Sequence, residues 1–395
     1  MSSIIERNPR LTYAIPIISV ILLSLLIDPL SIQRETPRYM LSALIQSEAA
    51  IVAIVITLSL VAVQLTASSY SSRVIGIFRN SPDFWGLLVL YLFAISLSSY
   101  ILEIIEVGYT PNLEISIRMC FLLGVFCFSA LIPYTYIMLT MLSPSTIIGK
   151  LSRRIDEENI LEADDPIQPI IDIVLGSMMR YDFETTKDGV GAVGEKICTL
   201  LKLGEYEKEE EKRISKRIFG HFSRISKIAA AREDEHSILV IIENIENISK
   251  AAAANNFKEI LKSILTLINE IGRTAVERRF EEGAARAVES QGMIVKKLVE
   301  EEEYLDRLMV TIGNINEMGK IALKKSLREV LVQEIVFFER ILETIKKKES
   351  AAEIKKPIMI IIKNSLEDLE KMTENVAYDM SQWCSAILSA NFNSN

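Results

Sequence analysis

The sequence is poor in the residues that most often carry enzyme chemistry. Only two histidines and four cysteines occur among 395 residues, and the cysteines are scattered without the spacing of a metal site or a disulfide framework. No catalytic Ser-His-Asp set, H-E-x-x-H sequence or Walker motif is present. We therefore expect a protein that is not an enzyme and that carries no cofactor and no metal site.

Two further signals are missing. Lys and Arg number 44 against 52 Asp and Glu, which gives a formal net charge of −8 and argues against a nucleic-acid partner. The chain also lacks the alternation of β-branched or aromatic residues with polar ones that is typical of strands. These two absences predict an all-α fold whose partners are not nucleic acids.

What the chain does have is a marked segregation of apolar and charged residues. Hydrophobic residues make up 49% of the chain, yet 24% of its residues are charged. Residues 1–147 hold four long apolar runs, and residues 148–395 are dense in Glu, Lys and Arg. Each run is about the 17–25 residues that cross a bilayer as a helix. The predicted spans, in a transmembrane domain of residues 1–147, are about 11–27, 42–72, 84–106 and 115–142.

The first run has a second interpretation. Arg7 and Arg10 precede it, as basic residues precede the apolar part of a cleaved signal peptide. No small-x-small cleavage site follows Asp28-Pro29, however, and three more apolar runs come after it. We therefore interpret the first run as a membrane span.

Basic residues near the spans predict the orientation. With a cytoplasmic N-terminus, seven of them fall inside and three outside, as the positive-inside rule requires. The inner ones are Arg7, Arg10, Arg73, Arg79, Lys150, Arg153 and Arg154, and the outer ones are Arg34, Arg38 and Arg118. Four spans return the chain to the inside, so the prediction is a multi-pass protein of the plasma membrane with both termini cytoplasmic.

The outer segments are acidic. The residues that would form an acidic outer mouth are Glu48, Glu103, Glu106 and Glu114. A negative field there would favour cations. The alternative interpretation is that acidic residues simply populate the side where Lys and Arg are scarce.

The second span carries a polar stripe. In ITLSLVAVQLTASSYSSR, residues 56–73, four polar side chains share a sector of about 60° on a helix. The candidates for a pore lining on this face are Thr57, Leu60, Gln64, Ser68 and Ser71. Small and hydroxyl residues also pack membrane helices together, so both a pore lining and a packing face fit this pattern.

The other spans contain polar but uncharged residues. Tyr91 in the third span and Tyr134 in the fourth are polar enough to pack against a partner helix. No Asp, Lys or Arg lies deep in a span, which disfavours a proton-coupled pump.

Residues 148–204 form a predicted helical connector next to the membrane. Asp165 before Pro166 reads as a helix N-cap followed by a first-turn proline. The Asp188–Gly191 segment, DGVG, reads as a turn after that helix. Such a turn could contact phosphate through its backbone, but it lacks the Lys-Ser/Thr ending of a P-loop.

Two stretches resemble a known family. VQLTASSYSSRVIGIF and PIIDIVLGSMMRYDFETTKDGVGAV resemble two stretches of a large family of predicted prokaryotic membrane proteins that is catalogued as a domain of unknown function. This chain departs from the family pattern, with Ser72 before Arg73 where a proline is typical and without an Asn-Asp-Pro after the second stretch. The resemblance implies a membrane protein with a soluble C-terminal part, and it brings no activity and no site residues.

Residues 205–395 form a predicted cytoplasmic helical-repeat domain. Apolar-periodic units of about 23 residues follow one another from Ile225 and end in short polar turns. These turns are predicted near Arg232, Asn255, Arg278, Glu302 and Lys325. Two antiparallel units form a hairpin of about 46 residues, the size of HEAT-type repeats, and the hairpins must stack to share one core.

Two functions fit these observations. The first is an oligomeric ion channel with cation preference, whose second span lines the pore and whose cytoplasmic array assembles or gates it. Its partners would be membrane lipid, inorganic ions and further copies of the chain. The second is a membrane-anchored scaffold or sensor whose helical array binds a cytoplasmic protein.

Overall fold

The computed structural model describes residues 14–26, 35–69, 82–107, 111–162, 165–299, 305–347, 352–373 and 378–392. The chain divides into two compact units, Met1–Ile147 and Ile148–Asn395. Within the described ranges the regular elements are α-helices and no strand occurs, which confirms the predicted all-α class.

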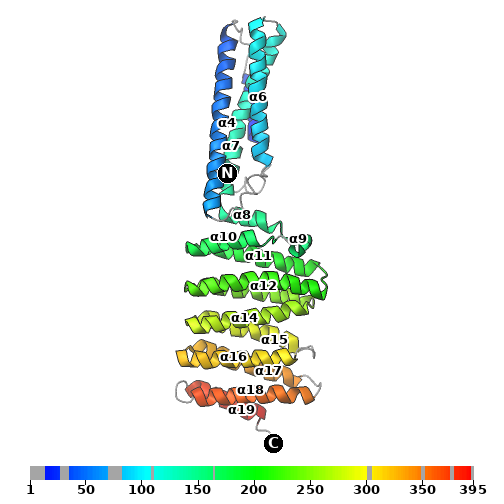
Figure 1. The fold of residues 1–395 in the computed structure, drawn as a ribbon, viewed down its shortest axis with the longest axis vertical. Helices are drawn as coiled ribbons and strands as arrows, with labels where there is room; N and C mark the ends of the chain where they lie inside the picture. Colours follow the sequence, from blue (N-terminus) through cyan, green and yellow to red (C-terminus); the bar gives the residue numbers. More distant parts are fainter. Residues whose placement is uncertain are drawn as a thin grey trace. The chain divides into compact units, whose positions relative to one another are not determined.

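The first unit contains four described helices (Figure 1). They are α3 (Ala14–Leu26), α4 (Glu35–Ser69), α6 (Pro82–Val107) and α7 (Pro111–Met141). Three stretches are long and apolar enough to cross a membrane, namely Pro37–Leu65, Phe84–Ile105 and Leu113–Met141. The described part of α3 has 13 residues, fewer than a span needs, and it packs against α7. The described residues thus contain three candidate spans.

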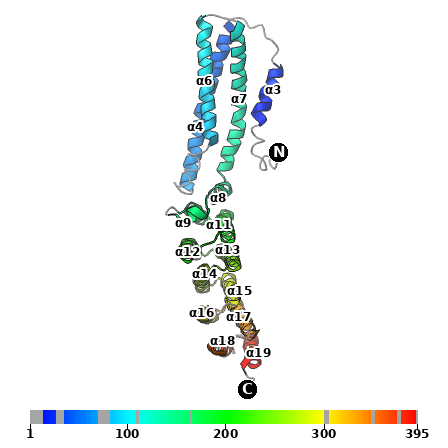
Figure 2. The same cartoon turned by 90° about the vertical axis from the view of Figure 1, so that its right-hand side faces the viewer.

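Helix α4 begins at Glu35 rather than near residue 42. Pro37 lies in its first turn, where the missing N–H leaves no hydrogen bond unmade. α4, α6 and α7 lie side by side, and each contacts the other two (Figure 2). Their shared core includes Leu41, Ile117 and Cys120, which are almost fully buried.

The helices that follow α7 are shorter and amphipathic. They are α8 (Pro144–Ser152), α9 (Glu157–Leu161), α10 (Gln168–Met179), α11 (Phe183–Leu203), α12 (Lys208–Ala231), α13 (Glu235–Ala254), α14 (Lys258–Arg278), α15 (Glu281–Val299), α16 (Leu305–Lys325), α17 (Arg328–Lys347), α18 (Ala352–Thr373) and α19 (Tyr378–Phe392). Such a helix is not stable in isolation, because its apolar stripe must be buried against neighbouring helices.

From α10 onward the helices alternate between two layers. One layer contains α10, α12, α14, α16 and α18, and the other contains α11, α13, α15, α17 and α19. Within each layer every helix contacts the next one, and Figure 2 shows the two layers as two rows of helices. The predicted helical array is therefore confirmed.

Several of the described turns between consecutive helices share one conformation. Glu233, Asn256, Arg279 and Ser326 have positive φ angles of 59–63°, the left-handed region. The residue after each of them donates its N–H to a carbonyl five residues back, and that acceptor is an alanine each time: Ala229, Ala252, Ala275 and Ala322. This pairing is the Schellman motif, which satisfies carbonyls at a helix C-terminus. The predicted turns near Arg232, Asn255, Arg278 and Lys325 lie at these sites, whereas Glu302 lies outside the described residues.

A carboxylate links the start of one helix to the start of the next helix in the same layer. Glu211 accepts a hydrogen bond from the N–H of Glu259 at 2.9 Å, and Glu235 accepts one from the N–H of Gly283 at 3.0 Å. Glu281 accepts one from the N–H of Glu329 at 2.8 Å. Each pair is 48 residues apart, so the repeating unit is one two-helix hairpin.

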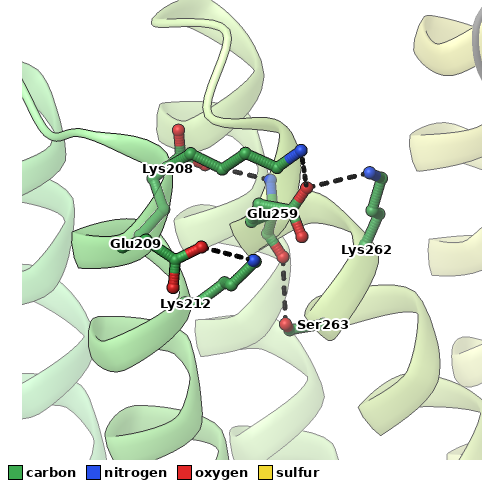
Figure 3. Close-up of polar contacts among 7 residues, drawn as sticks. Lys208, Glu209, Lys212, Glu259, Lys262 and Ser263 are labelled. Atoms are coloured by element: carbon green, nitrogen blue, oxygen red, sulfur yellow. Dashed lines mark hydrogen bonds and ion pairs between the residues drawn. The ribbon is translucent and has the colours of Figure 1, made fainter.

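The Glu259 side chain also joins α12 to α14 through charge. Its carboxylate lies between the ammonium groups of Lys262, at 2.9 Å, and Lys208, at 3.8 Å (Figure 3). The hydrogen bond from Lys262 is the main reason that the pKa of Glu259 lies below its ordinary value. These contacts fix the relative position of the two helix starts.

Candidate functional site

Helix α4 has a packed face and an exposed face. Leu41, Glu48, Val55, Ser59 and Ala62 are buried against the neighbouring helices of the first unit. These positions follow one another at intervals of three, four or seven residues, the spacing of one side of a helix. Two of the five are polar, so the interior of this unit is not purely apolar.

The opposite face of α4 is exposed and carries the predicted pore-lining residues. Thr57, Leu60 and Gln64 are all exposed within this chain. The Thr57 hydroxyl donates to the carbonyl of Ala53 at 2.8 Å, one turn back. The side chain of Ser68 and the whole of Ser71 lie outside the described residues. The three described positions thus share an exposed face of α4, opposite its buried face.

Small residues extend this exposed face toward the start of α4. Ala50 and Ala53 are exposed as well. Ala50, Thr57 and Gln64 recur every seven residues, and Ala53 and Leu60 lie between them with the same period. A seven-residue repeat keeps one seam in contact with another helix over several turns. We call these five residues the α4 seam.

Glu48 lies inside the membrane-capable stretch Pro37–Leu65, not at an exposed mouth. Its side chain is 0% exposed, and neither carboxylate oxygen has a hydrogen-bond partner. A Cβ added to Gly124 of α7 would lie 3.3 Å from Glu48 Oε1 and 2.6 Å from Leu44 Cδ1. The missing side chain of Gly124 therefore leaves the space that the Glu48 carboxyl occupies.

The other predicted acidic residues are placed differently. Glu103 is exposed on α6. Glu114 on α7 forms an ion pair with Arg118, one turn further on, at 2.6 Å. The side chain of Glu106 lies outside the described residues. The described members of the predicted acidic mouth are thus one buried, one exposed and one paired carboxylate.

Two tyrosines tie the helices of the first unit together. The Tyr134 hydroxyl on α7 lies 2.5 Å from the hydroxyl of Ser59 on α4. The Tyr91 hydroxyl on α6 donates to the carbonyl of Cys127 on α7 at 2.9 Å. Both tyrosines are buried, as expected for side chains that pack between helices.

The predicted turn at Asp188–Gly191 is wrong, because these residues lie inside α11. Gly189, Gly191 and Gly194 have the G-x-G-x-x-G spacing of a dinucleotide-binding loop, but that motif needs a strand before it and a helix start at the glycines. Here the glycines are mid-helix. A Cβ on Gly189 would collide with Val174 of α10, so this glycine permits close packing of two helices.

The predicted N-cap at Asp165 is also wrong, because the N-cap of α10 is Ile167, two residues later. α10 begins at Gln168, and Pro169 is the proline of its first turn. Asp165 instead accepts a hydrogen bond from the N–H of Ile167 at 3.0 Å and pairs with His221 of α12 at 2.7 Å. Burial alone would raise the pKa of Asp165, but the hydrogen bond and charge of His221 outweigh it and hold the pKa below its usual value.

Besides Glu211, two further glutamates of the described array are buried, and no sequence motif marked them. Glu246 on α13 accepts hydrogen bonds from Arg286, at 2.8 Å, and Ser290 on α15, beside a cavity of about 350 Å³. Glu334 on α17 is 0% exposed and has no hydrogen-bond partner. Burial raises its pKa well above the ordinary value, and the charge of Lys320 offsets part of that effect.

No group of three or more His, Cys, Asp or Glu side chains in the described ranges could hold a metal ion. In the first unit, helix α4 carries the α4 seam on one face and Glu48 on the opposite face.

Comparison with known proteins bears on the first unit. Residues 9–185 match the family described as predicted membrane protein (DUF2254). The resemblance expected from two short stretches is thus confirmed over one continuous stretch that includes α4, α6 and α7.

Other comparisons add little. No curated protein matches the chain. A solved structure titled "Circular tandem repeat protein with novel repeat topology and enhanced subunit contact surfaces" is 13% identical and covers 96% of this chain and 97% of its own. Its TM-score of 0.28 is too low to support an argument about the fold.

Proposed function

We propose that this protein is an oligomeric ion channel of the plasma membrane with a preference for cations. Copies of α4 surround the pore with the α4 seam facing its axis, and the cytoplasmic helical array assembles or gates the channel. The proposal includes four spans, with α3 as part of the first, and both termini in the cytoplasm. It involves no catalytic step, no cofactor and no nucleic acid.

The exposure of the α4 seam is the observation that carries this proposal. Exposed side chains of a membrane helix meet lipid, water or another protein chain. Gln64 and Thr57 both lie within the candidate span Pro37–Leu65, and an amide in hydrocarbon is unfavourable by several kcal/mol if unpaired. Because the Gln64 side chain is exposed in the described part of the chain, further copies of α4 or a water-filled pore would supply the partner that its amide needs.

The seven-residue period supports a symmetric arrangement. Helices that meet around a common axis do so along a seam with this repeat, and small residues such as Ala50 and Ala53 let their backbones approach closely. The acidic character of the outer segments, including the exposed Glu103, supports the preference for cations. The cation itself is not specified by these features.

Ion flux tests the proposal. The purified protein in liposomes is compared with the Gln64→Leu variant, and its oligomeric state is measured on the same sample. Leu58→Met serves as control, because Leu58 is exposed on α4 but lies off the seam. We expect flux through an oligomer, a several-fold change with Gln64→Leu and none with Leu58→Met. A monomer without flux over a range of ions, voltage and pH would contradict the channel.

Thiol labelling tests the pore lining separately. In a background with Cys120, Cys127, Cys198 and Cys384 replaced by alanine, we expect a Cys at position 64 to react with a water-soluble thiol reagent. A Cys at position 58 should react slowly, because it faces lipid. Equal protection of both positions would favour helix packing over a pore.

A scaffold or sensor is the second candidate, and an exposed aromatic patch favours it. Met179 and Tyr181, at the turn between α10 and α11, are 57% and 75% exposed. The Arg232 guanidinium lies 4.4 Å from the centre of the Tyr181 ring, which holds this turn against α12. Tyr, Met and Arg are enriched in protein interfaces. If the protein is a monomer without flux, a photo-reactive group placed at Tyr181 would test for a bound protein.

A further inference from the structure

Glu48 is a fully buried carboxyl group of the first unit. It lies in the middle part of a candidate span, is 0% exposed, and makes no hydrogen bond through either oxygen. A Cβ added to Gly124 would lie 3.3 Å from Glu48 Oε1, so the carboxyl lies close to the backbone of α7. A buried polar group without a partner is rare in proteins, and inside a membrane it points to a function.

The groups around Glu48 do not neutralise a negative charge. Those that act on it electrostatically are Tyr91 from α6 and Cys120 and Cys127 from α7, all of which are neutral or negative. The Tyr91 hydroxyl is used by the Cys127 carbonyl. Among the described residues no Lys, Arg or His forms an ion pair with Glu48, and Arg118 of α7 is paired with Glu114.

An isolated carboxylate in a medium of low dielectric constant is far less stable than the neutral acid. A metal cation would need five or six oxygen ligands, and the two oxygens of Glu48 with no charged neighbour do not supply them. We propose that Glu48 is an intramembrane proton-binding site, occupied in the packed arrangement of α4 on α7, and that loss of this proton separates the two helices.

This site is a second use of α4, on the face opposite the α4 seam. If the seam lines a pore, as proposed above, a proton on Glu48 also controls the position of the pore-lining helix. This control of the pore-lining helix rests on the proposed channel, whereas the proton-binding site does not. The test below therefore measures protonation directly and needs no ion flux.

Dicyclohexylcarbodiimide, a lipophilic reagent, adds to carboxyl groups that carry a proton. The full-length protein in liposomes is treated with it over a range of pH, and labelled peptides are identified by mass spectrometry. Glu103 is the internal control, because it is exposed on α6. We expect at least a several-fold excess of label on Glu48 over Glu103, falling as pH rises, and the reverse preference with a water-soluble carbodiimide.

The Glu48→Gln variant completes the test, because it mimics the protonated state. It should remain folded, lose the label at position 48, and lack one neutral-acid C=O stretching band in its infrared spectrum relative to wild type. Equal labelling of Glu48 and Glu103 by both reagents would overturn the proposal. So would the absence of both label and band, and so would protection of Glu48 by Na⁺ at constant pH, which would indicate a bound cation.

Discussion

The Glu211 carboxylate on α12 accepts a hydrogen bond from the backbone N–H of Glu259, 2.9 Å away at the start of α14. The first N–H groups of a helix have no partner within it, and a carboxylate there also interacts favourably with the helix dipole. Glu235 and Glu281 make the same contact with α15 and α17. The starts of α14, α15 and α17 are thus each capped by the helix two positions earlier.

Removing one of these caps should weaken the array locally. We expect Glu211→Ala to lower the free energy of unfolding by about 1–2 kcal/mol, because it leaves N–H groups of α14 without an acceptor. Glu211→Gln keeps an acceptor oxygen and should lose less. The control is Glu209→Ala, since Glu209 is exposed and pairs only with Lys212 of its own helix. Thermal unfolding and hydrogen exchange at residues 258–262 of the full-length protein provide the measurement, and equal exchange in both alanine variants would contradict the cap.

Glu334 should make the folded protein less stable as the pH rises. Its pKa is raised in the folded protein by burial, so folding favours the protonated form. That contribution is complete below the ordinary pKa of about 4.3 and is lost as pH rises through the folded-state value. We expect Glu334→Gln to unfold at a higher temperature than wild type at pH 8 and at a similar one at pH 4. Glu329→Gln, at an exposed position, should show no such divergence. A constant difference across pH would exclude titration of Glu334 as the cause.

Two glycines of α11 should respond in opposite directions to alanine. A Cβ on Gly189 would collide with Val174, whereas Gly191 has nothing within 4 Å of the added atom. We expect Gly189→Ala to destabilise the protein by about 1–3 kcal/mol through overpacking. Gly191→Ala should stabilise it by about 0.5–1 kcal/mol, because alanine favours the helix. Denaturant unfolding of the two variants side by side would decide this, and the same sign for both would be inconsistent with the packing described.

Gly124 should be sensitive to a single methyl group for a related reason. An added Cβ would lie 2.6 Å from Leu44 Cδ1 and 3.3 Å from Glu48 Oε1, so the Leu44 side chain must shift within the contact between α4 and α7. We expect Gly124→Ala to cost about 1–3 kcal/mol and to lower the unfolding temperature in detergent. Gly86→Ala on α6 is the control, because its added Cβ meets nothing within 4 Å. If both variants unfold at the same temperature, the α4–α7 contact is not close packed at Gly124.

The array was predictable from sequence because its signal is local. Each helix has an apolar stripe, and each ends where polar residues such as Arg232 and Asn255 interrupt the period. The layers follow from that repeat, because only stacking buries every stripe. The Gly189–Gly191 segment misled the prediction, since glycine usually marks a turn, and only the position of Val174 explains its place inside a helix.

The first unit was less predictable. The face of α4 that carries Thr57 and Gln64 follows from helical periodicity, and so does the fact that Glu48 lies on the opposite face. Whether either face is covered depends on α6 and α7, which are far away in sequence. The sequence feature that could have indicated the buried position of Glu48 is Gly124. A residue without a side chain leaves room for a carboxyl on the neighbouring helix.

The 48-residue spacing of the caps also has a consequence for ancestry. A tandem duplication of 48 residues that begins at one of these three glutamates would supply a new helix pair together with a glutamate placed to cap the following helix start. A deletion of the same length would place an earlier glutamate next to a later helix start, which it could then cap. Arrays of this kind can therefore lengthen or shorten by one hairpin without passing through an uncapped intermediate, and chains that share this ancestry should differ in length in steps of one hairpin.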